Sequence, residues 1–146
     1  MKGPNSMVTF DQLSKTIKAT HRQIWDDWYC GSNYVPARLQ IEQSDQASGY
    51  SHSNNQILLA IPSGNLEDFD VLNVDGWPLW KIELVHELLH EWQMKMPCVV
   101  TPQAEELCRR HKPRDCGRGH DPDFFQAIIE RSPYFEMTPE ELIEKI

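Results

Sequence analysis

The sequence predicts an α+β fold, because short β-strand patterns occur among several helical patterns without regular alternation between the two. The chain has 146 residues, 40% of them hydrophobic, which is enough for one domain with a hydrophobic core. We expect a single domain over residues 1–146, with its core at about 9–131 and a short C-terminal helix at 138–146.

The N-terminal half predicts one helix followed by two strands. Apolar residues recur at helical spacing from about Thr9 to Tyr29, and Thr9 or Ser6 could cap the start of this helix. Residues 37–42 alternate between apolar and polar, as a half-buried strand does. Residues 43–55 are rich in Ser, Asp, Gly and Asn and predict a loop. The apolar run at 56–61 predicts the second strand.

The C-terminal half predicts helices only. A helix apolar nearly all round is expected between Pro78 and Pro97, and such a helix is normally buried. Thr101 followed by proline begins a short helix, and the segment that starts at His120 begins another. Thr138 begins a capping-box sequence for the last helix.

The buried helix carries the motif H-E-x-x-H, formed by His86, Glu87 and His90. Residues four apart on a helix lie about 6 Å apart on one face, so both imidazoles can bind one Zn²⁺ at about 2.0–2.1 Å. Glu87 is offset around the helix and can take a proton from a zinc-bound water. The metzincin pattern is excluded, because Gln93 and Met96 stand where that class needs Gly and His.

A catalytic zinc usually has three protein ligands and one open position. Glu105 or Glu106 would supply a glutamate from a following helix, and Asp121 or Asp123 would complete a His-His-Asp site. His120 is the strongest candidate, because it lies at a helix entrance with a phenylalanine four residues further on. That phenylalanine can anchor the helix against the core and hold the imidazole in place.

The motif and the segment Gly119–Phe124 together resemble the SprT-like zinc metallopeptidases, which include the Spartan-type proteases. The resemblance covers roughly residues 10–131. It implies a small mixed sheet of a few strands packed against the N-terminal helix and the buried H-E-x-x-H helix. It also implies one catalytic zinc held by His86, His90 and His120, with Glu87 as the general base. The sequence departs from the family in a longer spacing before His120 and in Asp121, where glycine is usual.

Charge and composition limit the partners. The net charge of −8 argues against non-specific binding to nucleic acid, and no DNA-binding tail is recognisable. No apolar run approaches the roughly 20 residues that span a bilayer, and the first residues lack a signal-peptide pattern, so we expect a cytoplasmic protein without a membrane partner. A protein or peptide substrate is expected. The oligomeric state is left open.

The cysteines permit a second metal site. Cys108, His111, Cys116 and His120 offer four zinc-type ligands within a short segment, although the spacing is uncommon and His120 is assigned above. Without an export signal, free thiols or metal ligands are expected rather than disulfides.

These features predict zinc-dependent hydrolysis of peptide bonds. Tyr134, Tyr50 and His111 are candidates for the donor that stabilises the oxyanion. The strand at 56–61 could pair with an extended substrate if it lies at the sheet edge. Two other interpretations remain open: a zinc-stabilised binding or regulatory protein without turnover, and a structural domain whose histidines bind no metal.

Overall fold

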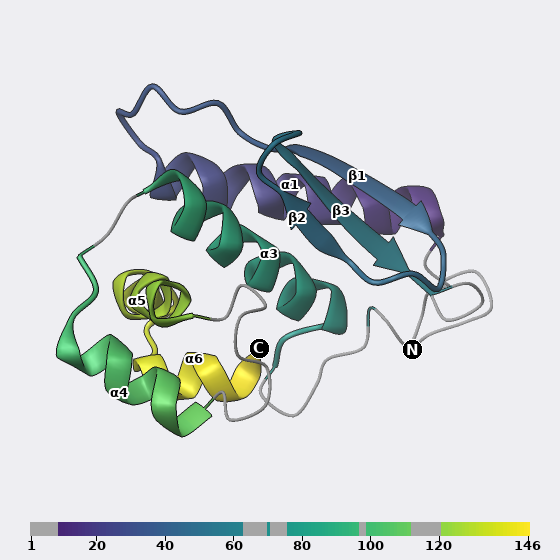
Figure 1. Cartoon of the computed structure of the whole chain (residues 1–146). Coiled ribbons are helices and arrows are strands. Elements are labelled where there is room, and N and C mark those ends of the chain that lie inside the picture. Colours follow the sequence, from purple (N-terminus) through teal and green to yellow (C-terminus); the bar gives the residue numbers. More distant parts are fainter. Residues whose placement is uncertain (1–8, 63–69, 71–75, 97–98, 112–120) are drawn as a thin grey trace. The chain divides into compact units, whose positions relative to one another are not determined.

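The structure is a computed structural model, which describes residues 9–62, 70, 76–96, 99–111 and 121–146. The described residues confirm the α+β class, with five α-helices, one 3-10 helix and a three-stranded mixed sheet (Figure 1). In chain order the elements are α1 (Phe10–Trp28), β1 (Arg38–Gln43), β2 (Gly49–Ser51), β3 (Gln56–Ile61), α3 (Leu79–Lys95), α4 (Pro102–His111), α5 (Pro122–Arg131), η2 (Ser132–Phe135) and α6 (Pro139–Lys145).

The chain divides into two compact units, residues 1–87 and 88–146, and the division falls inside α3. The single domain predicted for the whole chain stays a prediction. Within the described ranges, no helix is both long and apolar enough to cross a membrane.

Helix α1 begins and ends where the sequence predicts. Its N-cap Thr9 and residue Gln12 form a capping box, in which each side chain accepts a hydrogen bond from the other's backbone N–H. The buried face repeats at helical spacing through Leu13, Ile17 and Ile24. Because α1 contacts β1, this face covers the sheet.

The sheet has the order β1-β3-β2, so β3 is its central strand. Strand β1 runs parallel to β3, with Arg38 opposite Gln56, and β2 runs antiparallel to it, with Tyr50 opposite Ile57. The strand at 56–61 could pair with a substrate only at the sheet edge, and in the described sheet this condition is not met. Its Ile57, Leu59 and Ile61 point to one face of the sheet and are fully buried.

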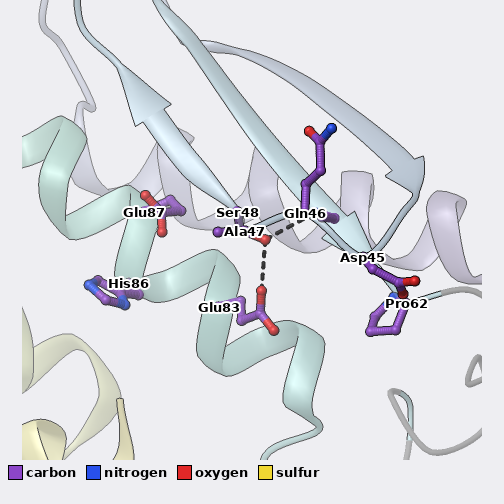
Figure 2. Close-up of a pocket in the computed structure, with 9 residues that line it drawn as sticks. Asp45, Gln46, Ala47, Ser48, Pro62, Glu83, His86 and Glu87 are labelled. Carbon is purple, nitrogen blue, oxygen red and sulfur yellow. Dashed lines mark hydrogen bonds between the residues drawn. The ribbon is translucent and has the colours of Figure 1, made fainter.

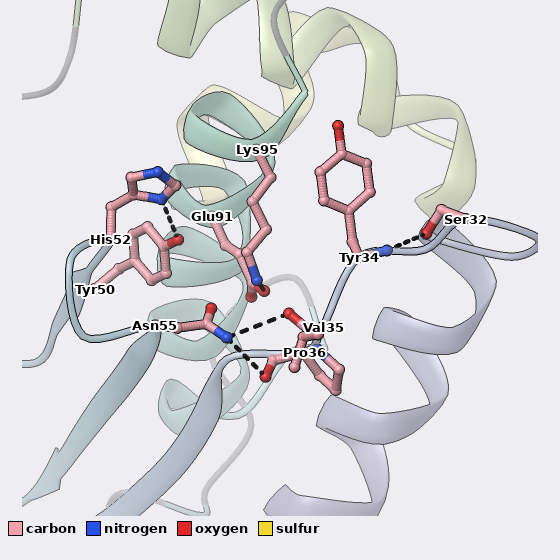
Figure 3. Close-up of polar contacts among 9 residues, drawn as sticks. All are labelled: Ser32, Tyr34, Val35, Pro36, Tyr50, His52, Asn55, Glu91 and Lys95. Carbon is pink, nitrogen blue, oxygen red and sulfur yellow. Dashed lines mark hydrogen bonds and ion pairs between the residues drawn. The ribbon is translucent and has the colours of Figure 1, made fainter.

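Strand β2 lies inside the segment that the sequence predicts as a loop. It has only three residues and no apolar alternation, so its extended conformation depends on pairing with β3. The connection turns at Asn55, whose φ of 48° is left-handed, a conformation that asparagine tolerates. The Asn55 side-chain amide also donates to the backbone carbonyls of Val35 and Pro36, which ties the turn to the chain entering β1 (Figure 3).

Helix α3 starts directly after Pro78, as predicted, and the carbonyl of Pro78 accepts hydrogen bonds from Lys81 and Ile82. It ends at Lys95, while Pro97 lies outside the described residues. The helix is largely buried, in agreement with its sequence. Its fully or nearly fully buried apolar residues are Trp80, Leu84, Val85, Leu88, Leu89 and Trp92.

In the second unit, α4 and α5 pack against each other, and α5 also contacts η2 and α6. Thr101 caps α4 by accepting from the Ala104 N–H, and it donates to the side chain of Gln126 in α5. The capping box predicted at Thr138 forms with Glu141. The indole N–H of Trp92, on the C-terminal half of α3, donates to Glu130 of α5 at 2.9 Å.

Candidate functional site

Helix α3 presents the two histidines of the motif. His86 and His90 are four residues apart on one continuous α-helix, so they lie on the same face, one turn apart. Both are half-buried. The helical geometry that the motif requires is therefore present.

Glu87 lies at a pocket of about 400 Å³ in the first unit (Figure 2). The pocket is bordered by the β1–β2 loop, the end of β3 and the N-terminal half of α3, and its walls include Asp45, Ser48, Ala60, Glu83 and His86. The side chain of Glu87 is buried, with 7% of its surface exposed. The half-buried imidazole of His86 and the buried carboxyl of Glu87 therefore line the same pocket.

The surroundings of Glu87 raise the pKa of its carboxyl from 4.5 to about 7. The main cause is burial, which disfavours the charged form, and the neighbouring carboxylate of Glu83 adds to it. A hydrogen bond from the backbone of Tyr50 in β2 acts in the opposite direction. A carboxyl with a pKa near neutrality can both accept and donate a proton at physiological pH.

Ser48 holds one wall of this pocket in place. Its hydroxyl donates to Oε1 of Glu83 at 2.7 Å and accepts from the backbone N–H of Ala60 at 2.9 Å (Figure 2). The β1–β2 loop is thus joined both to α3 and to β3. The sequence contains no signal for this contact, because Ser48 and Glu83 are 35 residues apart and Ser48 lies in a generally polar stretch.

His90 has partners of its own in the second unit. Its Nδ1 lies 3.0 Å from Oε1 of Gln93, and its ring stacks on Phe124 of α5 with centroids 4.4 Å apart. Because an amide oxygen accepts, this contact matches the tautomer with the proton on Nδ1 and the lone pair on Nε2. This arrangement fits an imidazole that binds zinc, since such ligands commonly donate their other N–H to an acceptor. Gln93 is not part of the H-E-x-x-H motif, so the motif alone does not predict this contact with His90.

His120, the predicted third ligand, lies outside the described residues. Asp121, which follows it, is the N-cap of α5, and the first turn of that helix carries the phenylalanine stacked on His90. Among the residues that the structure does describe, no three His, Cys, Asp or Glu side chains form a group able to hold a metal ion. The three-histidine site stays a prediction.

The residues considered in place of His120 as third zinc ligand all lie within the described part of the chain. Glu105 and Glu106 are exposed on α4, where Glu106 forms ion pairs with Arg109 and Arg110. Asp123 accepts a hydrogen bond from the N–H of the next residue.

For the second metal site, the structure describes only part of the ligand set. Cys108 is a buried thiol in α4, and His111 is exposed at the end of the same helix. Cys116 lies outside the described residues.

The oxyanion donor stays unassigned among the three candidates. The Tyr50 hydroxyl is hydrogen-bonded to Nδ1 of His52 at 2.9 Å (Figure 3). The Tyr50 backbone interacts with Glu87. Tyr134 lies in η2, with 39% of its surface exposed, and His111 is exposed as described above.

Comparisons with protein-family models, curated proteins and solved structures find no match to this chain.

Proposed function

We propose that the chain is a zinc-dependent metallopeptidase of the SprT-like type, which hydrolyses peptide bonds in a protein or peptide substrate. The observation that carries the proposal is the state of Glu87. It is a buried carboxyl with a pKa of about 7, one residue after a half-buried histidine and at the wall of a pocket. Perturbed carboxyls in clefts are typical of general acid–base residues.

His86, His90 and His120 would hold the zinc ion, which when bound would polarise the scissile carbonyl and the attacking water. Glu87 takes a proton from that water and delivers it to the leaving amine. In the metal-free chain neither form of the carboxyl is strongly favoured at neutral pH, so this side chain is able both to accept and to donate a proton. The hydrogen bond from the Tyr50 backbone fixes the position of the carboxyl while it exchanges protons.

Strand β2 is the best candidate for binding the substrate backbone. It pairs with β3 on one side and is an edge strand of the described sheet, whereas β3 has neighbours on both sides. The backbone of Tyr50 in β2 is bonded to Glu87, so this strand runs beside the proposed general base. An extended peptide added to β2 by backbone hydrogen bonds would therefore bring its own backbone close to Glu87.

Zinc quantification combined with cleavage of casein tests the proposal. Wild-type protein is expected to bind one zinc ion and to cleave casein, and a chelator is expected to abolish cleavage. The variant Glu87→Gln should keep the metal and lose about 10²–10⁴-fold in rate, the usual contribution of a general acid–base group. Glu144→Gln, at an exposed glutamate on α6, is the matched control and should cleave like wild type.

The same measurements separate the rival functions. A full equivalent of zinc with no cleavage by wild type would favour a binding or regulatory protein. Protein without appreciable zinc, even after incubation with it, would favour a structural domain and overturn the proposal.

A further inference from the structure

The His90 imidazole is held at one nitrogen by a side chain from its own helix. Gln93 lies three residues further along α3, and its Oε1 is 3.0 Å from Nδ1 of His90. A neutral imidazole has one nitrogen that donates and one that accepts. An amide oxygen facing Nδ1 selects the form with the proton there, and Nε2 is then the nitrogen that can bind a divalent cation.

The plane of the same ring is fixed by α5. Phe124 stacks on His90 with an interplanar angle of 28°, and only 4% of Phe124 is exposed. Phe124 in turn meets the ring of Phe125 edge-on, with centroids 5.9 Å apart. Because Phe124 is confined by its own packing, it restricts rotation of the imidazole. Stacking and the hydrogen bond together favour one orientation and one tautomer.

We infer that Gln93 is a positioning residue for the candidate metal centre: its amide oxygen keeps the His90 proton on Nδ1 and so presents Nε2 to the cation. The inference rests on the proposed function, because a fixed tautomer matters to the protein if His90 binds metal. Hydrogen-bond partners behind a metal-binding histidine typically contribute 10–100-fold to metal affinity.

A purely structural role for Gln93 makes different predictions. A hydrogen bond between residues three apart on a helix surface stabilises the helix slightly, whatever the state of the imidazole. Removing it would then lower stability without changing the His90 tautomer or the affinity for zinc. The test therefore has to measure the tautomer and the affinity directly.

The tautomer is measured on metal-free protein labelled with ¹⁵N-histidine, by two-bond ¹H–¹⁵N correlation at about pH 8, above the range in which imidazoles ordinarily titrate. The His90 signals are assigned by their loss in His90→Gln. Wild type is expected to show a protonated Nδ1 and an unprotonated Nε2. Gln93→Leu should lose this preference, while Gln93→Glu keeps an acceptor and should retain it. The control Gln103→Leu changes an exposed glutamine on α4 and should have no effect.

Zinc affinity of the same proteins is then measured by competition with a chromophoric chelator. Gln93→Leu is expected to bind zinc about 10–100-fold more weakly, while Gln93→Glu and Gln103→Leu stay close to wild type. Wild-type protein with the proton on Nε2 of His90 would overturn the inference. So would an unchanged tautomer and affinity in Gln93→Leu. If wild type binds no zinc, the proposed function fails, and the tautomer measurement still shows separately whether Gln93 holds the His90 proton.

Discussion

The raised pKa of Glu87 predicts a specific dependence of stability on pH in the metal-free protein. The carboxyl has a pKa of about 7 in the folded chain, against an ordinary value of 4.5. Between these two values the folded state binds more protons at Glu87 than the unfolded state does. The stability that protonated Glu87 contributes is therefore fully present below about pH 4.5 and is lost as the pH rises through 7.

The size of the effect follows from the same two values. One pKa unit corresponds to about 1.4 kcal/mol, so ionising Glu87 in the folded chain costs about 3 kcal/mol relative to the unfolded chain. Glutamine has nearly the same shape and does not titrate. The free energy of unfolding of Glu87→Gln, measured relative to wild type, should therefore increase by about 3 kcal/mol between about pH 4.5 and pH 8.

Urea unfolding in the presence of a chelator measures this difference. The chelator is needed because a bound cation near Glu87 would favour the ionised carboxylate. Glu144→Gln, the same substitution at an exposed glutamate on α6, is the control. A difference between Glu87→Gln and wild type that does not change from pH 4.5 to pH 8 would refute the reasoning. It would mean that the folded chain does not disfavour the charged carboxylate.

Three further predictions concern the surroundings of the motif. Ser48→Ala should lower the free energy of unfolding by about 1–3 kcal/mol, because it removes the hydroxyl that bonds both Glu83 and the β3 backbone; urea unfolding measures this. Asp45 is an exposed charge on the pocket wall, and it would face a substrate side chain if the pocket receives one. Asp45→Asn should then reduce kcat/KM for a peptide with Lys beside the scissile bond by about twofold to fivefold more than kcat/KM for the matching Glu peptide. Lys95 pairs with the buried carboxylate of Glu91 (Figure 3). Lys95→Met removes this ammonium and should lower the free energy of unfolding by about 3–5 kcal/mol, which a thermal or urea melt measures.

The parts of the fold that could be predicted from the sequence are those determined by neighbouring residues. The capping box predicted at Thr138 forms, and Thr9, one of the two predicted candidates, caps α1 in a second capping box; each involves a partner three residues away. The start of α3 is determined by Pro78, and β3 by a short apolar run. In each case the information lies within a few residues, where hydrogen-bonding and steric rules apply directly.

The parts that could not be predicted depend on contacts between distant segments. Strand β2 has no strand-like pattern of its own and is extended because β3 is there to pair with it. The central position of β3 likewise depends on which strands lie on either side. At the site, the motif identifies His86 and Glu87, but not the burial that raises the pKa of Glu87, because segments distant in the sequence, such as β2 and the β1–β2 loop, lie beside this side chain.

Three glutamates lie on successive turns of α3, and Glu87 differs from the other two in its partners. Glu83 accepts from the Ser48 hydroxyl, and Glu91 is paired with Lys95. Glu87 is as buried as a core residue, yet within the described residues it has no ion pair with Lys or Arg, and its pKa is raised accordingly. The cost of about 3 kcal/mol above neutral pH is a substantial part of the 5–15 kcal/mol that stabilises a typical domain. An uncharged side chain at this position would avoid that cost, and a binding protein that used only His86 and His90 would have no need of the carboxyl. If Glu87 is the proposed general base, its exchange of protons would account for a titratable side chain at so buried a position.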